Sequence, residues 1–303
     1  MGEIHAKVLS AIDGVSLSVL VANDIPRGQH LATQMGIARV TADYQAVLSD
    51  PQIDAVVIAT PSDMHVDHAV MAAEAGKACL LEIPASLNLA GAYQIAAAQE
   101  RSGTPIMVAH SRRFSPAHQF IKRGIETGSF NLQHLVAQTF FMRRSNVNML
   151  GQSRGWTDSL LWHHACHTVD LFSWLLDEDA YDVWAQRGPI HPELGIAMDM
   201  SIGMRSRTTG QLLTLALSFN NRGPFGGFYR YIGQEETYLA YRDELTDADG
   251  QIISSSGSAF DIQDREFIDA IRSRRPPQCG IHSVMRSMIL LDQIEQVMRA
   301  GEC

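Results

Sequence analysis

The 303-residue sequence has no long apolar run, no paired cysteine spacing and no excess of positive charge. No stretch approaches the roughly 20 apolar residues that span a bilayer, so no membrane role is expected. Its four cysteines have no disulfide or metal-binding spacing, which favours reduced thiols in a cytoplasmic protein. The 33 acidic and 24 basic residues give a net charge of −9, which argues against nucleic acid or an anionic membrane as partner.

The first 110 residues contain an alternation of two sequence patterns. Short apolar runs lie at residues 15–21, 55–60, 78–82 and 105–110. Alanine-rich helical segments, such as residues 66–75 and 90–101, lie between them. Nearly continuous apolar strands between helices are typical of a parallel sheet covered on both faces. We therefore predict an α/β, Rossmann-type, doubly wound dinucleotide-binding domain over residues 1–114.

Residues 115–303 have a different pattern. Strand-favouring segments follow one another with few helices between them, at residues 133–144, 196–207, 212–220 and 228–241. This order indicates a large, mostly antiparallel sheet. Residues 263–274 and 284–300 have helical spacing. We predict an α+β substrate-binding domain whose C-terminal helices can pack back on the first domain.

The start of the sequence departs from the usual order of a dinucleotide-binding domain. Such a domain opens with a strand, a G-x-G-x-x-G turn and a helix. Here Gly2 stands at the place of the third glycine, directly before a helix-like segment at residues 3–11. We expect the first strand and two glycines, about ten residues, to be truncated, with the native start upstream. The alternative is that Gly2 is an ordinary N-terminal glycine.

Four motifs together resemble those of one oxidoreductase family. Residues 2–5 (G-E-I-H) resemble the end of its glycine motif, and residues 60–65 (T-P-S-D-M-H) its T-P-x-x-x-H. Residues 82–84 (E-I-P) stand in the place of its E-K-P, and residues 113–116 (R-F-S-P) in that of its R-x-x-P. This is the Gfo/Idh/MocA family, and the resemblance spans nearly the whole chain. It implies a dehydrogenase that uses NADP or NAD.

Longer strings are similar to one branch of this family. They are residues 110–114 (H-S-R-R-F), 140–144 (F-F-M-R-R), 161–171 (L-W-H-H-A-C-H-T-V-D-L) and 218–221 (S-F-N-N). The resemblance implies oxidation of a small dicarboxylated semialdehyde from aromatic ring cleavage, in its cyclic hemiacetal form, to a lactone. It also implies a homodimer or a higher homo-oligomer. The alternatives are a sugar or polyol dehydrogenase of the same family, or a non-catalytic NAD(P)-binding sensor.

Two positions depart from the broad family. The lysine of the family's E-K-P motif is often catalytic, and Ile83 stands at its position here. The family usually also has an aspartate four residues before a histidine, and here His163 stands at that position, four residues before His167. The released proton must therefore go to a histidine, to water or to the substrate. We predict His163, His167 and His164 as catalytic, since imidazole accepts protons near neutral pH and positions i and i+4 of one helix share a face. A metal-binding pair and a structural pair are the alternatives, and we predict no metal.

Two arginine doublets on strand-like segments are candidates for binding the substrate carboxylates. Arginine holds a carboxylate through two parallel hydrogen bonds. Because neighbours on a strand point to opposite faces, one arginine of each pair should face the substrate. The resemblance favours Arg113 and Arg143, then Arg112, with Asn220 orienting a hydroxyl or carboxylate. Structural salt bridges and capping of a strand end are the alternatives.

The predicted cofactor contacts come from the motifs at the carboxyl edge of the parallel sheet, where nucleotides bind in such folds. They are Gly2, Asn23, Arg27, Thr60, Pro61, His65, Glu82 and Pro84. Glu82 is expected to hold the nicotinamide ribose hydroxyls. Specificity for the adenine ribose is usually set at the end of the second strand of such a domain, and here that position is Ala22. Ala22 permits NADP, with Arg27 near its phosphate, whereas the nearby Asp24 favours NAD. The residues alone leave NADP or NAD open.

Overall fold

The computed structural model describes residues 1–147, 157–242, 244–254 and 257–301. The chain folds into two compact units. Unit 1 comprises residues 1–111 and 260–284, and unit 2 comprises residues 112–259 and 285–303. The predicted domain boundary after residue 114 stays a prediction. Among the described residues, no helix is both long and apolar enough to cross a membrane.

Unit 1 contains the parallel strands that the apolar runs predicted. β1 (Val19–Val21) pairs with β2 (Arg39–Thr41), and β4 (Ala78–Leu81) lies between β3 (Ala55–Ile58) and β5 (Ile106–Val108). Every residue of β4 is buried, as expected for a central parallel strand. The strands form separate two-stranded and three-stranded sheets, and no strand of the described chain is hydrogen-bonded between β1 and β3.

Local capping explains where the helices of unit 1 begin and end. Side chains of Asp24, Asp43 and Asn88 accept backbone N–H groups at three helix starts. Gly36 and Gly103 end two of these helices with positive φ. The helices are α1 (Gly2–Ser10), α2 (Ile25–Met35), α3 (Tyr44–Leu48), α4 (His65–Glu74), α5 (Leu89–Ser102) and α8 (Ala259–Arg272). A 3₁₀ turn, η1 (Ser62–Met64), precedes α4. The Rossmann-type prediction is confirmed.

Unit 2 is built on an eight-stranded sheet in the order β13-β12-β11-β10-β6-β9-β8-β7. Only the β6–β9 pair is parallel among these described strands, which confirms the mostly antiparallel prediction. The strands are β6 (Leu132–Phe140), β7 (Tyr181–Arg187), β8 (Asp199–Ser206), β9 (Leu212–Ser218), β10 (Gly226–Gly233), β11 (Thr237–Tyr241), β12 (Glu244–Thr246) and β13 (Ile252–Ser254).

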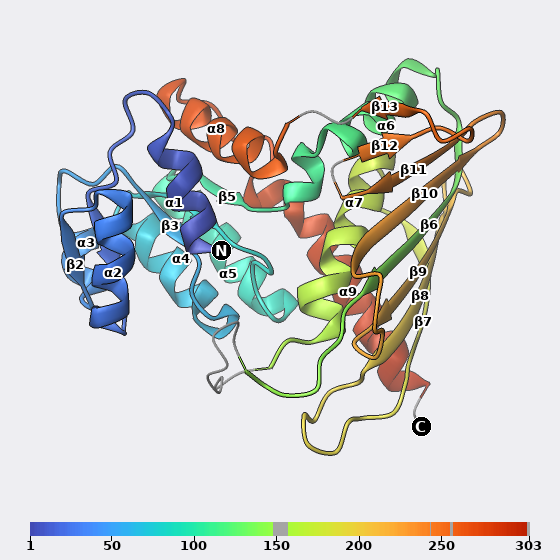
Figure 1. Cartoon of the computed structure of the whole chain (residues 1–303), viewed down its shortest axis with the longest axis horizontal. Coiled ribbons are helices and arrows are strands. Elements are labelled where there is room, and N and C mark those ends of the chain that lie inside the picture. The colour runs from blue at the N-terminus through green and yellow to red at the C-terminus, as the bar shows by residue number, and fades with distance from the viewer. Residues whose placement is uncertain (148–156, 243, 255–256, 302–303) are drawn as a thin grey trace. The chain divides into compact units, whose positions relative to one another are not determined.

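Helices cover one face of this sheet, namely α6 (Pro116–Thr127), α7 (Cys166–Leu176) and the unit 2 part of α9 (Ile281–Ala300) (Figure 1). Burial alternates along β8 and β9, as a sheet with one covered face requires. The Tyr231 hydroxyl of β10 lies 2.6 Å from Nδ1 of His118 in α6, which ties that helix to the sheet. The other face carries exposed residues such as Trp184 and Arg230.

Two short segments of unit 2 differ from the sequence predictions. Arg112 and Arg113 do not lie on a strand but in a 3₁₀ turn, η2 (Ser111–Phe114). His163 and His164 lie in a π-helical turn, η3 (Leu160–Ala165), whereas His167 lies in the first turn of α7. The single α-helix predicted for the three histidines is therefore wrong, because the hydrogen-bonding pattern changes between residues 163 and 167. Single π-helical turns often occur at functional sites.

Candidate dinucleotide and substrate sites

A buried imidazole lies between two carboxylates at the carboxyl end of β4. His5 comes from α1, Glu82 directly follows β4, and Asp264 comes from α8. The His5 Nε2 atom lies 2.9 Å from Oε1 of Glu82. Its Nδ1 atom lies 3.0 and 2.8 Å from the two carboxylate oxygens of Asp264. All three side chains are buried, so these contacts are shielded from water.

The charge on His5 follows from this environment. Burial lowers the pKa of its imidazole, but the hydrogen bonds and charges of Asp264 and Glu82 outweigh burial and raise the pKa to about 9. His5 is therefore an imidazolium at neutral pH and can donate one N–H to each carboxylate. Sequence reasoning missed His5 and Asp264 as site residues. Position 5 belonged to the quoted glycine motif, but nothing in the sequence pairs it with residue 264.

His65 joins the loops that follow β3 and β4. Its Nδ1 atom lies 2.8 Å from the carbonyl oxygen of Pro84, and its Nε2 atom lies 3.0 Å from that of Thr60. The side chain is buried, whereas Thr60 is exposed. In this geometry both ring nitrogens of His65 contact backbone carbonyls, so His65 positions the two loops and leaves Thr60 at their surface.

The residues of this sheet edge fit a nicotinamide dinucleotide. No side chain caps the first turn of α1, which leaves backbone N–H groups of the kind that bind pyrophosphate. Glu82 offers carboxylate lone pairs for ribose hydroxyls beyond the hydrogen bonds from His5 and from the Ile83 N–H. Arg27 and Asn23 are exposed at the start of α2, where the Asp24 carboxylate accepts the Arg27 backbone N–H.

In unit 2, Arg143 and His164 both contact Asp158. Arg143 makes a hydrogen-bonded ion pair with the Asp158 carboxylate, and Nε2 of His164 lies 3.9 Å from it. Burial raises the pKa of Asp158, but His164 and Arg143 outweigh burial and hold that pKa at about 2. The His164 ring packs between Phe141 and Phe219 at centroid distances of 5.2 and 5.0 Å. Asp158 therefore keeps a negative charge beside this imidazole, another feature that sequence reasoning missed.

The Nδ1 atom of His163 accepts a hydrogen bond from the backbone. The backbone N–H of Ser159 donates to it at 3.0 Å, so neutral His163 carries its proton on Nε2 and can donate from that atom. His163, His164 and His167 are all half-buried. The predicted histidines thus differ in their surroundings, since the Nδ1 atom of His163 accepts a backbone N–H and the Nε2 atom of His164 lies 3.9 Å from the Asp158 carboxylate.

Arg113 occupies a structural position. Its Nε and Nη2 atoms donate to Asp170 at 2.8 and 2.6 Å, and the Ser287 hydroxyl donates to the same carboxylate at 2.9 Å. Arg113 is 5% exposed and Asp170 is 0% exposed. This pair uses the Nε–Nη2 edge of the guanidinium for a two-point contact of the kind predicted for the substrate, so the geometry favours the salt-bridge alternative for Arg113.

Arg112 differs from the other predicted arginines. Its side chain makes no hydrogen bond or ion pair with any residue that the structure describes, and its Nε atom is buried. The guanidinium lies 5.8 Å from the centroid of the Tyr229 ring. Burial, followed by the positive charge of Arg112, lowers the pKa of His118 to about 3. This cluster therefore contains a cation that no described carboxylate neutralises.

Asn220 takes part in a network at the end of β9. Its amide nitrogen donates to Asp199 at 2.6 Å, and its carbonyl oxygen accepts from Arg144 at 3.0 Å. Both polar atoms of the Asn220 amide are thus used within the chain. This arrangement favours the predicted alternative, in which Asn220 caps a strand end.

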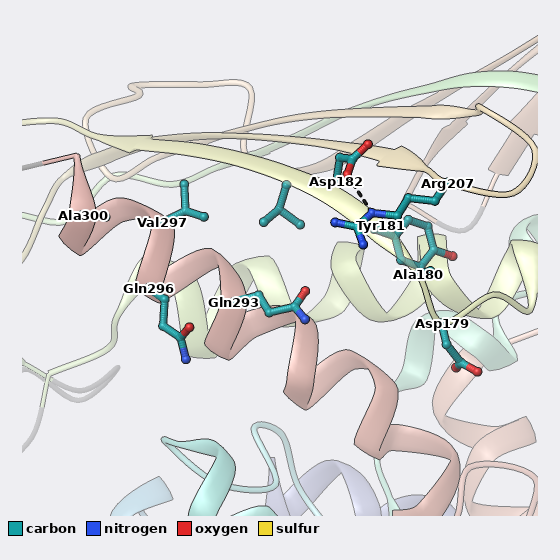
Figure 2. Close-up of a pocket in the computed structure, with 10 residues that line it drawn as sticks. Asp179, Ala180, Tyr181, Asp182, Arg207, Gln293, Gln296, Val297 and Ala300 are labelled. Atoms are coloured by element: carbon teal, nitrogen blue, oxygen red, sulfur yellow. Dashed lines mark hydrogen bonds and ion pairs between the residues drawn. The ribbon is translucent and has the colours of Figure 1, made fainter.

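A pocket of about 650 Å³ lies elsewhere in unit 2, between β7 and α9 (Figure 2). Gln293 and Gln296 of α9 line it, together with Asp182 and Arg207, which form an ion pair at 2.7 Å. None of the predicted site residues lines this pocket. Among the described residues, no group of three or more His, Cys, Asp or Glu has the arrangement of a metal site.

Comparison with known proteins gives the class of the chain. Residues 1–110 match the Gfo/Idh/MocA family model, described as an oxidoreductase family with an NAD-binding Rossmann fold. Residues 116–259 match the C-terminal domain of bacterial oxidoreductases. The chain is 40% identical to 4-carboxy-2-hydroxymuconate-6-semialdehyde dehydrogenase of Sphingobium sp. (strain NBRC 103272 / SYK-6), over 97% of this chain and 94% of that protein.

Solved structures have the same fold. Levoglucosan dehydrogenase in complex with NADH and levoglucosan has a TM-score of 0.87 at 19% identity, covering 99% of this chain and 95% of that one. An oxidoreductase from Agrobacterium radiobacter in complex with NAD+, L-tartaric acid and magnesium has a TM-score of 0.84 at 17% identity, covering 99% and 94%. The chain belongs to the Gfo/Idh/MocA family. It is an NAD(P)-dependent dehydrogenase, which confirms the predicted family, fold class and cofactor class.

Proposed function

We propose that the chain oxidises the cyclic hemiacetal of 4-carboxy-2-hydroxymuconate-6-semialdehyde to the lactone 2-pyrone-4,6-dicarboxylate, with NADP or NAD as cofactor. The observation that carries this proposal is the 40% identity, over 97% of the chain, to the Sphingobium dehydrogenase named for this semialdehyde. The departure at Ile83 also supports it, because the lysine of the broad family is absent at that position. The ring oxygen of a hemiacetal already stabilises the carbon that loses hydride, so a lysine base is dispensable there.

Carboxylate binding supports the choice of a doubly anionic substrate. In the proposed complex, the guanidinium of Arg112 binds a substrate carboxylate, because no described residue of the chain neutralises it. Arg143 is oriented by Asp158 and by the Phe219 ring, whose centroid lies 5.0 Å from its guanidinium. We assign the second carboxylate to Arg143, whose position these two contacts fix. Arg113 stays outside the proposed contacts, because Asp170 holds it.

Proton transfer is assigned to His164. When bound, the nicotinamide accepts the hydride. His164 takes the proton of the hemiacetal hydroxyl, and the Asp158 carboxylate at 3.9 Å stabilises the resulting imidazolium. His163 donates a hydrogen bond from Nε2 to a substrate oxygen, since its Nδ1 accepts from Ser159. His167 stays a predicted catalytic residue on the same segment.

In unit 1, the proposed dinucleotide contacts are those of the parallel sheet edge. The uncapped first turn of α1, including Gly2, faces the pyrophosphate, and Glu82 accepts hydrogen bonds from ribose hydroxyls. Thr60 and Pro61 lie on the loop after β3 that His65 ties to Pro84. Asn23 and Arg27 are assigned to the adenosine end, where Arg27 can pair with a 2′-phosphate. A homodimer also remains a prediction.

The test is turnover by the purified chain with NADP and with NAD, followed by nicotinamide absorbance. The semialdehyde is compared with an inositol and an aldose, and the product is identified by mass. We expect oxidation of the semialdehyde alone, with the lactone as product. Oxidation of the inositol or aldose without the semialdehyde would contradict the substrate assignment. Dinucleotide binding without any turnover would instead favour the sensor alternative.

A further inference from the structure

Three elements that are distant in sequence meet at His5. It lies in α1, Glu82 follows β4, and Asp264 is 259 residues further along the chain, in α8. Gln263 Nε2 also donates to Oδ1 of Asp264 at 3.2 Å. The Phe260 ring lies nearly perpendicular to the His5 ring at a centroid distance of 6.1 Å. His5 is thus held on one side by a carboxylate that is itself oriented, while its other nitrogen holds Glu82.

We propose that Asp264 is a positioning residue for the dinucleotide: it orients His5, and His5 holds the Glu82 carboxylate where it receives ribose hydroxyls. This inference rests on the Glu82 contact of the proposed function. Asp264 is 0% exposed, so in this proposal it acts on the dinucleotide through His5 and does not contact it directly. Both carboxylate oxygens of Asp264 lie within hydrogen-bonding distance of Nδ1, which fixes the plane of the imidazole ring and directs Nε2 at Oε1 of Glu82.

The same geometry makes dinucleotide binding depend on pH. Among the described residues, the charged groups that contact His5 are Glu82, after β4, and Asp264, on α8. An imidazolium donates to both carboxylates, whereas neutral imidazole has a single N–H and can donate to one. Loss of the proton therefore removes one of these two charge-assisted hydrogen bonds. When the remaining N–H donates to Asp264, Glu82 keeps only the hydrogen bond from the Ile83 N–H, its orientation is less fixed, and ribose binding weakens.

The experiment measures dinucleotide affinity without substrate. NADH is titrated into wild-type protein, Asp264→Asn and the control Asp261→Asn, and binding is followed by calorimetry. Asp261 lies on the same helix, is half-exposed and pairs with Arg265, so it gives the same charge change away from His5. We expect Asp264→Asn to weaken NADH binding by on the order of tenfold, the size of one charge-assisted hydrogen bond. The control should bind as wild type does.

Two further measurements separate the possible failures. If Glu82→Gln binds NADH as tightly as wild type, the Glu82 contact itself is wrong. If Glu82→Gln weakens binding and a folded Asp264→Asn does not, the positioning role of Asp264 is wrong. Should Asp264→Asn not fold, the wild-type pH profile decides: affinity should fall as the pH rises through about 9. A flat profile across this range would overturn the inference.

Discussion

The Arg113 guanidinium and the Asp170 carboxylate form a two-point ion pair in the interior of unit 2, with Nε–Oδ2 and Nη2–Oδ1 distances of 2.8 and 2.6 Å. It joins η2 to α7, and Ser287 of α9 donates to the same carboxylate. A substrate carboxylate would have to displace Asp170 to use the same donors. Removal of either partner leaves an uncompensated buried charge, which is a stability effect and not a binding effect.

We therefore expect Asp170→Asn and Arg113→Met to destabilise the protein by about 3–5 kcal/mol. Denaturant unfolding measures this change. The exposed pair Arg101–Glu74, whose side chains are 60% and 55% exposed, is the control, because Arg101→Met should cost less than about 1 kcal/mol. Normal stability together with a raised KM in Arg113→Met would return Arg113 to the substrate contacts.

Arg112→Met should lower kcat/KM for the doubly anionic substrate by about 10- to 100-fold, since a charge-assisted hydrogen bond contributes about 1.5–3 kcal/mol. Its affinity for NADH should stay unchanged. Arg230→Met is the matched control, because Arg230 lies exposed on β10 beside Tyr229. Steady-state kinetics on both variants give the answer. Equal kcat/KM for wild type and Arg112→Met would remove Arg112 from the substrate site.

The proton acceptor is tested by His164→Gln, which should reduce kcat by about 10²- to 10⁴-fold, the usual contribution of general base catalysis. NADH affinity should not change. His134→Gln serves as control, since His134 bonds only Thr214 at 2.9 Å among the hydrogen bonds of described residues. A similar loss in His163→Gln with full activity in His164→Gln would move the proton acceptor to His163.

Asp158 gives a prediction about acid stability. Its folded-state pKa of about 2 lies below its ordinary 3.8, so its ionised form stabilises the fold above pH 3.8, and this contribution is lost as the pH falls through 2. The shift corresponds to about 2 kcal/mol. Asp158→Asn should be less stable than wild type near neutral pH, and the two should converge in strong acid. Denaturant unfolding at several pH values checks this, and a constant difference across pH would contradict it.

The sequence predicted the sheets well and the ion pairs poorly, for a physical reason. The pattern of apolar residues along a strand reflects only that strand's own surroundings. All residues of β4 are apolar and buried, which indicates two covered faces, whereas burial alternates along β8, which indicates one. The partner of Arg113 lies 57 residues away, and the fold alone brings it close. The sequence thus predicted which cations could bind a carboxylate, but not that Asp170 already binds one of them.

The histidine segment shows a second limit. Residues 160–165 have the composition of an ordinary helix, and nothing in them predicted a π-helical turn. The hydrogen bond from the Ser159 N–H to His163, which separates the roles of His163 and His164, depends on that local backbone. Resemblance to a family marked this segment as a candidate site, and that assignment stays a prediction, whereas the hydrogen bond to His163 follows only from the folded backbone.

Alkaline stability should report on His5 and Asp264. The folded-state pKa of His5, about 9, lies above its ordinary 6.5, so its stabilising contribution is fully present below pH 6.5 and is lost as the pH rises through about 9. The shift corresponds to about 3 kcal/mol. Because other groups also titrate in this range, the difference between wild type and Asp264→Asn is the quantity to measure. The free energy of unfolding of wild type should exceed that of the variant at pH 6.5, and the gap should narrow above 9. A gap that stays constant would show that the proton on His5 does not stabilise the fold through Asp264.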